Sequence, residues 1–243
     1  MSNRILATAA VLTGVLLARG AGAQTSAPSN PAPNLSGVWT ITNFRQNLWE
    51  MSPELAAAKA GPPYTPEAAA RYKAIDHATV DTGPSSRCLP PGVAFLMTMP
   101  YALEIIQIPG RVLTYHEFGN YVRQIFVDGR DHADAYPTWL GHSTGRYEND
   151  TLVVDTVGFN GKGWQDMTGM PGSDALHTVE RFKRTSPTDL DYSMTLEDPK
   201  VFTKPWTIQA KFRLQPTFNI VEFVCMENNL YVGSPGMKVE ATK

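Results

Sequence analysis

From residue 103 onward, hydrophobic and polar residues alternate in short runs that are separated by turn residues. In the segment 190–197 the apolar residues stand at every second position, which is the period of a β-strand with one buried face. Runs of this kind predict strands near residues 103–108, 111–118, 121–127, 142–147, 152–157, 177–183, 190–197, 206–214 and 220–226. The chain is therefore predicted to be mostly β, as an antiparallel meander.

Three tight turns predict how neighbouring strands pair. They are the dipeptides Pro109-Gly110, Gly119-Asn120 and Asn149-Asp150, which are typical of two-residue hairpin connections. Counting outward from these turns predicts that residue 106 faces 113, 116 faces 123, 118 faces 121 and 144 faces 155.

The first three of these strands carry apolar side chains on both faces, so both faces need cover. A meander closed into a lipocalin-like barrel, or folded into a sandwich, provides that cover. The segment Gly37-Val38-Trp39 resembles the Gly-x-Trp opening strand of lipocalin-like barrels. Two short helices are predicted over residues 53–60 and 66–75, the second with Thr65 as its N-cap. An extended, proline-rich stretch is expected over residues 85–100.

The N-terminal pattern is typical of export. Arg4 precedes an apolar run over residues 5–18, and Ala21-Gly22-Ala23 forms a small-x-small cleavage site. Residues 1–23 are therefore predicted to be a signal peptide that is cleaved after Ala23. The apolar run is too short to span a bilayer, so no stable membrane insertion is expected. Residues 24–34 are predicted to be a disordered lead-in, and residues 35–243 a single β-rich domain.

Export implies a periplasmic or secreted protein in an oxidising environment. The chain has two cysteines, Cys88 and Cys225, which we expect to form one disulfide between the proline-rich stretch and the last predicted strand. Two unpaired buried thiols are the alternative.

Composition and charge narrow the function further. The chain is 42% hydrophobic and 18% charged, which is typical of a folded globular domain. Its formal net charge of -2, with no basic block, argues against a nucleic-acid partner. The five histidines lack the spacings of common metal sites, so no metal is predicted, although separate strands could assemble one. Glycine-rich phosphate loops and dinucleotide motifs are absent from the sequence, and no cofactor is expected.

His142 and Asp155 form the first candidate site. The predicted register places them one diagonal step apart on one face of the sheet. A carboxylate that orients an imidazole supports a general base. Ser143 points to the opposite face, so no Ser-His-Asp triad is predicted. A structural pair that closes a sheet edge is the alternative.

His116 forms a second candidate. The predicted register places it opposite Arg123, on a face shared with Phe118 and Tyr121. A histidine beside a guanidinium tends to stay neutral and can accept a proton. The alternative is a histidine of the barrel core. His132 follows an Asp128-Gly129-Arg130 segment that we interpret as an exposed turn.

The connection over residues 158–176 is long and rich in glycine and methionine. Connections of this length are usually functional or disordered, and its aromatic residues argue against disorder. We predict a lid over a pocket at one barrel end, with Trp164 and Met167 in contact with the ligand. The lid leads into His177, which we favour narrowly over His142 as the base, with Asp166 as its partner.

Several motifs resemble a large family of exported bacterial proteins of uncertain function, from about Leu35 to Asn229. The motifs are Cys88-Leu89-Pro90-Pro91-Gly92, the stretch GHSTGRYENDTLVVDT over residues 141–156, Trp164-Gln165-Asp166 followed by Leu176-His177 and Glu180-Arg181-Phe182, and Asp198-Pro199 with Pro205-Trp206. The segment Cys225-Met226-Glu227 departs from the Cys-His-Glu form common in that family. The resemblance implies no particular reaction, but it concentrates on the hairpin of His142 and on the lid.

These patterns predict an exported, cofactor-independent lyase, isomerase or hydrolase that uses acid–base chemistry on a small, largely apolar, aromatic molecule. The predicted catalytic residues are His177, His142, Asp155 and Asp166. The predicted substrate-binding residues are Trp164, His116, Arg123, Phe118, Tyr121 and Met167. The main alternative is a calycin-type carrier without catalysis, and an envelope interaction module is a third.

Overall fold

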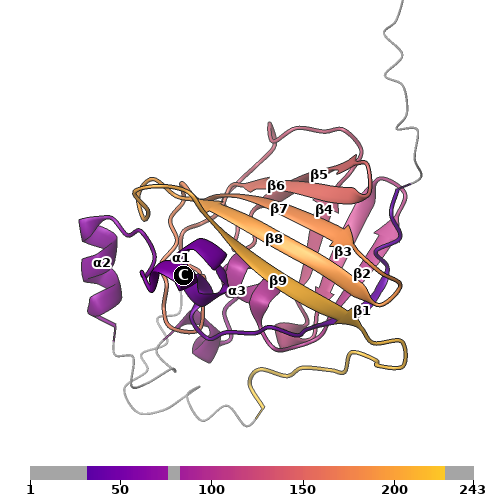
Figure 1. Cartoon of the computed structure of the whole chain (residues 1–243), viewed down its shortest axis with the longest axis horizontal. Helices are drawn as coiled ribbons and strands as arrows, with labels where there is room; N and C mark the ends of the chain where they lie inside the picture. Colours follow the sequence, from indigo (N-terminus) through magenta and orange to yellow (C-terminus); the bar gives the residue numbers. More distant parts are fainter. Residues whose placement is uncertain (1–31, 76–82, 228–243) are drawn as a thin grey trace, which may run out of the picture.

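The computed structural model describes residues 32–75 and 83–227. The predicted signal peptide and most of the lead-in lie outside the described residues. Among the described residues, nine strands follow one another around a closed barrel, and the first pairs with the last (Figure 1). The strands are β1 (Gly37–Ile41), β2 (Leu103–Ile108), β3 (Arg111–His116), β4 (Val122–Phe126), β5 (His142–Glu148), β6 (Thr151–Val157), β7 (His177–Arg184), β8 (Asp189–Glu197) and β9 (Trp206–Leu214). The prediction of a mostly β, lipocalin-like barrel is confirmed.

One strand junction of the barrel, between β4 and β5, has few paired residues, and we call it the seam. Strand neighbours elsewhere are antiparallel, as a meander requires. Strands β4 and β5 instead run parallel, and only two residue pairs join them, Ile125 with Ser143 and Phe126 with Thr144. A parallel pair needs a crossover, which the connection over residues 127–141 supplies. This connection becomes important for the site below.

Two of the four predicted pairings are confirmed, and two are wrong. Residue 106 faces 113, and 144 faces 155. Arg123, however, faces Thr114 rather than His116. The cause is the turn η4 (Phe118–Asn120), in which Gly119 and Asn120 adopt positive φ angles of 69° and 51°. This turn lengthens the predicted two-residue connection, so 118 does not face 121. The register slips by two, which keeps His116 and Arg123 on the same face.

The predicted strand over residues 220–226 is also wrong, because this segment has no strand structure. The strand that closes the barrel is β1, which pairs with both β2 and β9 and buries Trp39. The C-terminal segment instead lies beside η4, where the Phe223 amide donates to Asn120 Oδ1 at 2.8 Å. The predicted disulfide is confirmed, because Cys88 and Cys225 are bonded with their Cα atoms 5.6 Å apart.

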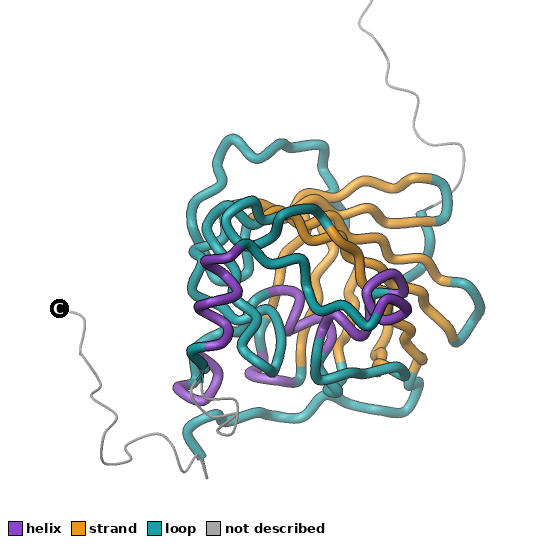
Figure 2. The backbone as a smooth tube through the Cα atoms, turned by 60° about the vertical axis from the view of Figure 1, so that its left-hand side comes forward, coloured by secondary structure: helices purple, strands orange, loops and turns teal. Residues whose placement is uncertain are grey.

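Helices lie toward one end of the barrel, as the tube view also shows (Figures 1 and 2). Besides η4, the helices are η1 (Leu48–Met51), α1 (Pro53–Ala58), α2 (Pro66–Lys73), η3 (Pro84–Arg87) and α3 (Val93–Thr98). The predicted N-cap is confirmed, since Thr65 Oγ1 accepts from the Ala68 amide at 3.2 Å. The stretch predicted to be extended instead contains η3 and α3. All six residues of α3 are buried, so their hydrophobicity drives this helix into the core.

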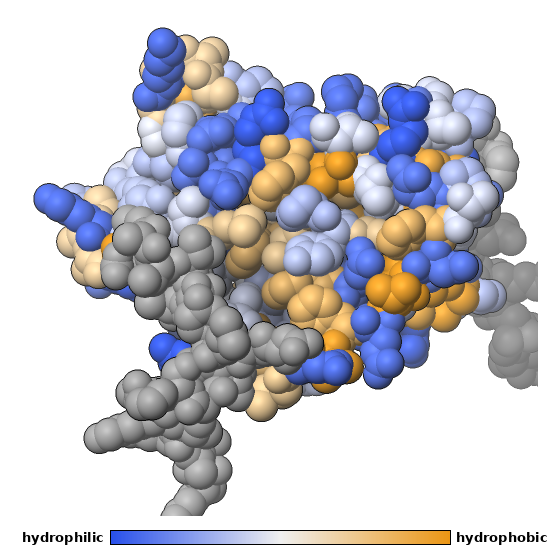
Figure 3. Space-filling model, turned by 90° about the horizontal axis from the view of Figure 1, so that it is seen from below, coloured by the Kyte–Doolittle hydropathy of each residue, from blue (hydrophilic) through white to orange (hydrophobic). Residues whose placement is uncertain are grey.

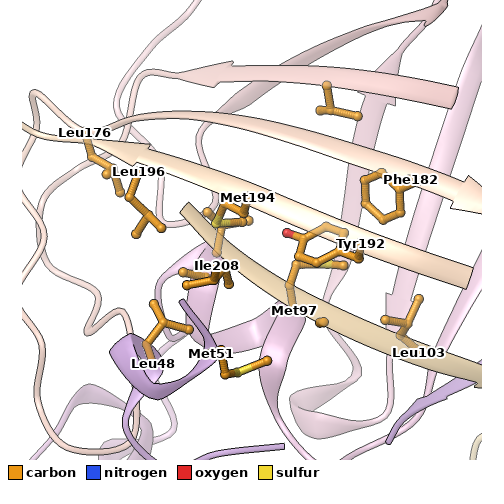
Figure 4. Packing of buried hydrophobic residues seen from close by; sticks show 14 of the residues in the cluster. Leu48, Met51, Met97, Leu103, Leu176, Phe182, Tyr192, Met194, Leu196 and Ile208 are labelled. Atoms are coloured by element: carbon orange, nitrogen blue, oxygen red, sulfur yellow. The ribbon is translucent and has the colours of Figure 1, made fainter. Parts of the chain in front are cut away.

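The core is continuous from the helices into the barrel. Figure 4 shows Leu48 of η1 and Met97 of α3 packing among strand residues such as Tyr192. The barrel interior is thus filled by its own side chains over this region. No helix among the described residues has the length and hydropathy needed to cross a membrane. Seen from below, hydrophobic and hydrophilic residues are interspersed on the surface (Figure 3).

Candidate active site at the seam of the barrel

Strands β5, β6 and β7 place one polar set inside the barrel and another outside it. Ser143, Thr156 and Thr178 pair across the three strands and are fully buried. Their chain neighbours His142, Asp155 and His177 point the other way, because side chains alternate along a strand. The structure therefore confirms that Ser143 and His142 lie on opposite faces.

The inner set is built around a buried ion pair between Arg123 and Glu180. The Arg123 guanidinium donates to Glu180 Oε1 at 2.9 Å, to Ser143 Oγ at 3.0 Å and to Thr156 Oγ1 at 2.8 Å. The Tyr192 hydroxyl donates to Glu180 Oε1 at 2.8 Å. A buried charge pair of this kind needs its remaining hydrogen bonds satisfied, and these partners satisfy them. We call these five residues the inner cluster.

His116 lies inside the barrel as well. Its Nε2 is 3.0 Å from Thr114 Oγ1. Burial, and then the nearby Arg123 charge, lower the pKa of His116 to about 3, so the ring is neutral. The predicted partners Phe118 and Tyr121 lie elsewhere, at η4, where the Phe118 ring is 5.1 Å from that of Phe223. The structure thus does not bring the four residues into one binding face.

The outer set forms a chain of hydrogen bonds with one longer polar contact at its end. Asp155 Oδ1 is 2.9 Å from His132 Nε2, and Asp155 Oδ2 is 2.9 Å from His177 Nε2. His132 Nδ1 is in turn 2.9 Å from His142 Nδ1. At the other end, His177 Nδ1 lies 3.5 Å from Glu197 Oε2. We call these five residues the histidine network.

When His132 is neutral, the network determines which nitrogen of His132 and of His142 carries a proton. The Asp155 carboxylate only accepts, so His132 donates from Nε2. In a neutral His132 the Nδ1 atom then holds a lone pair, and His142 must donate to it from its own Nδ1. His142 Nε2 is left with a lone pair and no proton. Burial is the largest cause that lowers the pKa of His142, and the nearby positive charge of Arg130 contributes, which favours a neutral His142.

A pocket of about 540 Å³ opens beside His142, at the seam between β4 and β5. The crossing connection 127–141 forms one wall of it and β4 forms another. We call it the seam pocket; its lining residues are Pro90, Val122, Arg123, Gln124, Phe126, Arg130, Asp134, Tyr136, Thr138, Trp139, Leu140, Gly141, His142 and Ser143. The Phe126 ring stacks on the His142 ring with centroids 5.5 Å apart. The Arg130 guanidinium lies 3.8 Å from the centre of the Phe126 ring.

Sequence reasoning missed His132 and the seam pocket. The turn before His132 is exposed, as predicted, but the connection then folds back and brings the half-buried His132 onto Asp155. The available signal was the length of the segment 127–141, which separates two strands that cannot form a hairpin. Only a parallel pairing of β4 and β5 makes that segment cross the seam, and the sequence predicted an antiparallel meander throughout.

The predicted lid has a different role from the one expected. Asp166 is buried and accepts from the backbone amides of Leu48 at 3.2 Å, Thr168 at 2.9 Å and Met170 at 2.9 Å. Burial raises the pKa of Asp166, and these bonds hold the loop in place. The carboxyl is therefore not the partner of His177, which pairs with Asp155 and Glu197.

Trp164 of the predicted lid serves packing too. Trp164 packs so closely on the backbone at Gly83 that a Cβ there would lie 2.6 Å from the ring. It lines a separate depression with Ile75 and Gly169. Met167 is half-buried in the same loop and is not among the residues of the seam pocket.

Over the described ranges, the structure contains no group of three or more histidine, cysteine, aspartate or glutamate side chains placed to hold a metal ion. The imidazoles of the histidine network form hydrogen bonds with one another, with Asp155 and with Thr144. What the arrangement offers chemically is a set of linked proton donors and acceptors that ends at a ring beside a pocket.

Comparison with known proteins adds no family to this picture. The resemblance to exported bacterial proteins stays a prediction. No model of a protein family matches the chain, and a search of curated proteins finds no significant relative.

Proposed function

We propose that the protein is an exported acid–base enzyme that acts on a small, largely apolar, aromatic molecule in the seam pocket. His142 is its general base. One observation carries the proposal: the ring of His142 lines the pocket, and the histidine network leaves its Nε2 as a free proton acceptor.

The network supplies the support that a base needs. When His142 Nε2 takes a proton from the substrate, the ring gains a positive charge. Its Nδ1 proton can then shift toward His132 Nδ1, 2.9 Å away, and the His132 Nε2 proton faces the Asp155 carboxylate. The charge is thereby stabilised by Asp155 through His132, which acts as a positioning residue. The reverse transfer returns the proton to the product.

The pocket supports the substrate class. Phe126, Tyr136 and Trp139 present aromatic rings, and Leu140 adds an aliphatic surface. Aromatic rings pack well against one another in offset or edge-on arrangements. Arg130 can bind a carbonyl or phenolate oxygen, since it is exposed and its ion pair with Asp128 is a surface pair. An aromatic lactone, ester or ether-linked dimer has both features.

The proposal places His142 ahead of His177 as the base. His177 belongs to the histidine network but is not among the residues that line the seam pocket. Its position on Asp155 makes it a second support for that carboxylate. The localisation in the periplasm or outside the cell is part of the proposal, and the disulfide between Cys88 and Cys225 is consistent with it.

The test is a screen of the protein that begins at Gln24 against aromatic dimers, lactones and esters between pH 5 and pH 9. We expect turnover of at least one compound, and His142→Ala to lower kcat/KM by about 10²-fold or more. His177→Ala is the matched control and should lose less than about tenfold. Thermal stabilisation by a compound with no product from any of them would instead support the calycin-type carrier. Full activity of His142→Ala would exclude the proposed base.

The pH profile provides a second readout. A general base must be unprotonated, and burial lowers the pKa of His142 below its ordinary value of 6.5. We therefore expect kcat/KM to fall on the acid side only below pH 6.5. Replacing Arg130 by Gln removes a nearby positive charge, so the acid limb should move toward higher pH.

A further inference from the structure

We propose that the outer wall of β7, β8 and β9 carries a second binding site, for an acidic carbohydrate. A depression of about 480 Å³ lies on this wall, bounded on one side by the segment 43–53 that follows β1. It shares no lining residue with the seam pocket. The site is thus independent of the proposed enzyme activity.

Strand register explains why polar side chains gather there. Lys183, Asp191 and Lys211 face one another across the three strands and form one row on the outer face. Arg181, Ser193 and Gln209 form the next row by the same pairing. Neighbouring strands are about 4.8 Å apart, so each row presents three polar groups within reach of one sugar ring.

Exposed ion pairs gather in and around the depression. Four cations line it, Arg45, Arg181, Lys183 and Lys211, together with two carboxylates, Glu50 and Asp191. Two further carboxylates pair with these cations, Glu148 with Arg181 and Asp150 with Lys183, each at 3.0 Å. An anionic ligand would therefore bind by exchange with these carboxylates.

The cations can be recruited by a ligand at low cost. The Lys183 and Lys211 ammonium groups pair with Asp150 at 3.0 Å and with Asp191 at 3.1 Å, and all four side chains are at least half exposed. Exposed pairs of this kind stabilise a protein by at most about 1 kcal/mol. A carboxylate on a ligand can therefore replace either partner.

The mixture of groups points to an acidic sugar rather than to another anion. Glu50 and Asp191 can accept hydrogen bonds from hydroxyl groups, which inorganic phosphate ions would offer poorly at neutral pH. Ser193 and Gln209 can both donate and accept. The one aromatic residue among those lining the depression is Tyr192, which is only 2% exposed and offers no ring for stacking a nucleobase. A uronic-acid oligosaccharide provides both carboxylates and hydroxyls.

The experiment is a titration of the ¹⁵N-labelled protein with tetragalacturonic acid, followed by amide chemical shifts and by calorimetry. Maltotetraose, which has the hydroxyls without the carboxylates, and inorganic phosphate are the comparison probes. We expect tetragalacturonic acid to bind most tightly, with shifts concentrated in β7, β8 and β9 and an affinity that falls as salt is added.

Variants locate the site. Arg181→Gln and Lys211→Gln should each weaken binding by about fivefold, and Lys204→Gln, a matched change of an exposed lysine outside the depression, should not. All three side chains are exposed, so unchanged thermal unfolding serves as the folding control. Equal binding of maltotetraose, equal binding of phosphate, or an equal loss in Lys204→Gln would overturn the proposal. So would shifts that lie outside these strands.

Discussion

The wall formed by β5, β6 and β7 carries Glu180 on its inner face and Asp155 on its outer face, and these two carboxylates have different surroundings. Glu180 faces inward, is fully buried, and accepts from Arg123 and Tyr192. Asp155 faces outward, is 33% exposed, and lies between two histidines. Asp155 on β6 and Glu180 on β7 lie on adjacent strands at neighbouring register positions. Their surroundings differ because a strand turns successive side chains to opposite sides.

Burial determines how completely a charged group must be paired. Inside the barrel every charge has to be matched, because an unmatched one costs several kcal/mol. The inner cluster is accordingly built so that no proton needs to move. Outside, the imidazoles of the histidine network are partly exposed and linked by hydrogen bonds. The same three strands thus give the fold its internal ion pair and give the candidate active site its proton carriers.

The largest effect should come from breaking the inner pair. Glu180→Gln removes one charge at nearly constant shape and leaves the Arg123 guanidinium buried without its counter-charge. We expect the free energy of unfolding to fall by about 3–5 kcal/mol, measured by urea denaturation. Replacing both partners with apolar residues, as in Arg123→Met with Glu180→Leu, should recover part of the loss. A change below 1 kcal/mol in Glu180→Gln would show that the pair is not a structural requirement.

Sequence pattern predicted much of the barrel because alternation and turn residues act locally. The hairpin of β5 and β6 is an example, since Asn149 and Asp150 leave Glu148 facing Thr151 and therefore Thr144 facing Asp155. The pairing at η4 failed because Gly119 and Asn120 support a wider turn as readily as a tight one. Helix α3 was missed because the prolines and glycine before it suggested an extended chain, while five of its own six residues are apolar.

The candidate site was predicted in part, for a related reason. His142, Asp155 and His177 lie on regular strands, and their common face follows from the strand period alone. His132 comes from the connection 127–141, whose path depends on the parallel pairing of β4 and β5. No local sequence pattern predicts that parallel pairing. Asp166 was assigned to chemistry because it lies in a long loop, yet its hydrogen bonds hold that loop against η1.

The second effect concerns stability at acid pH, where the buried His116 inside the barrel should behave differently from the partly exposed His142 outside it. The pKa of His116 is about 3 in the fold and about 6.5 in an unfolded chain. Between these values the unfolded state binds a proton that the folded state does not, so stability falls as the pH falls. The contribution is about 1.4 kcal/mol per pH unit.

The variant His116→Gln removes this contribution. We expect the difference in unfolding free energy between wild type and His116→Gln to be constant above pH 7. It should then shift in favour of the variant as the pH falls from 6.5 to 4, in urea denaturation at each pH. The comparison variant His142→Gln should show a smaller shift, because that ring is only partly buried. Parallel curves for wild type and His116→Gln would contradict a neutral, buried His116.

The smallest effect on stability should come from the outer carboxylate. Asp155→Asn is the counterpart of Glu180→Gln, since it also removes one charge at constant shape. The contacts that it weakens, to His132 and His177, are partly exposed to water, so we expect a loss of no more than about 1 kcal/mol in the free energy of unfolding. The same variant should nevertheless reduce turnover, because an amide can donate to His132 Nε2 and so reverse the tautomer that leaves His142 Nε2 free. Small loss of stability together with lower kcat/KM is the expected result for a positioning carboxylate. A loss of stability as large as that of Glu180→Gln would instead make the outer carboxylate structural and remove the contrast between the two faces.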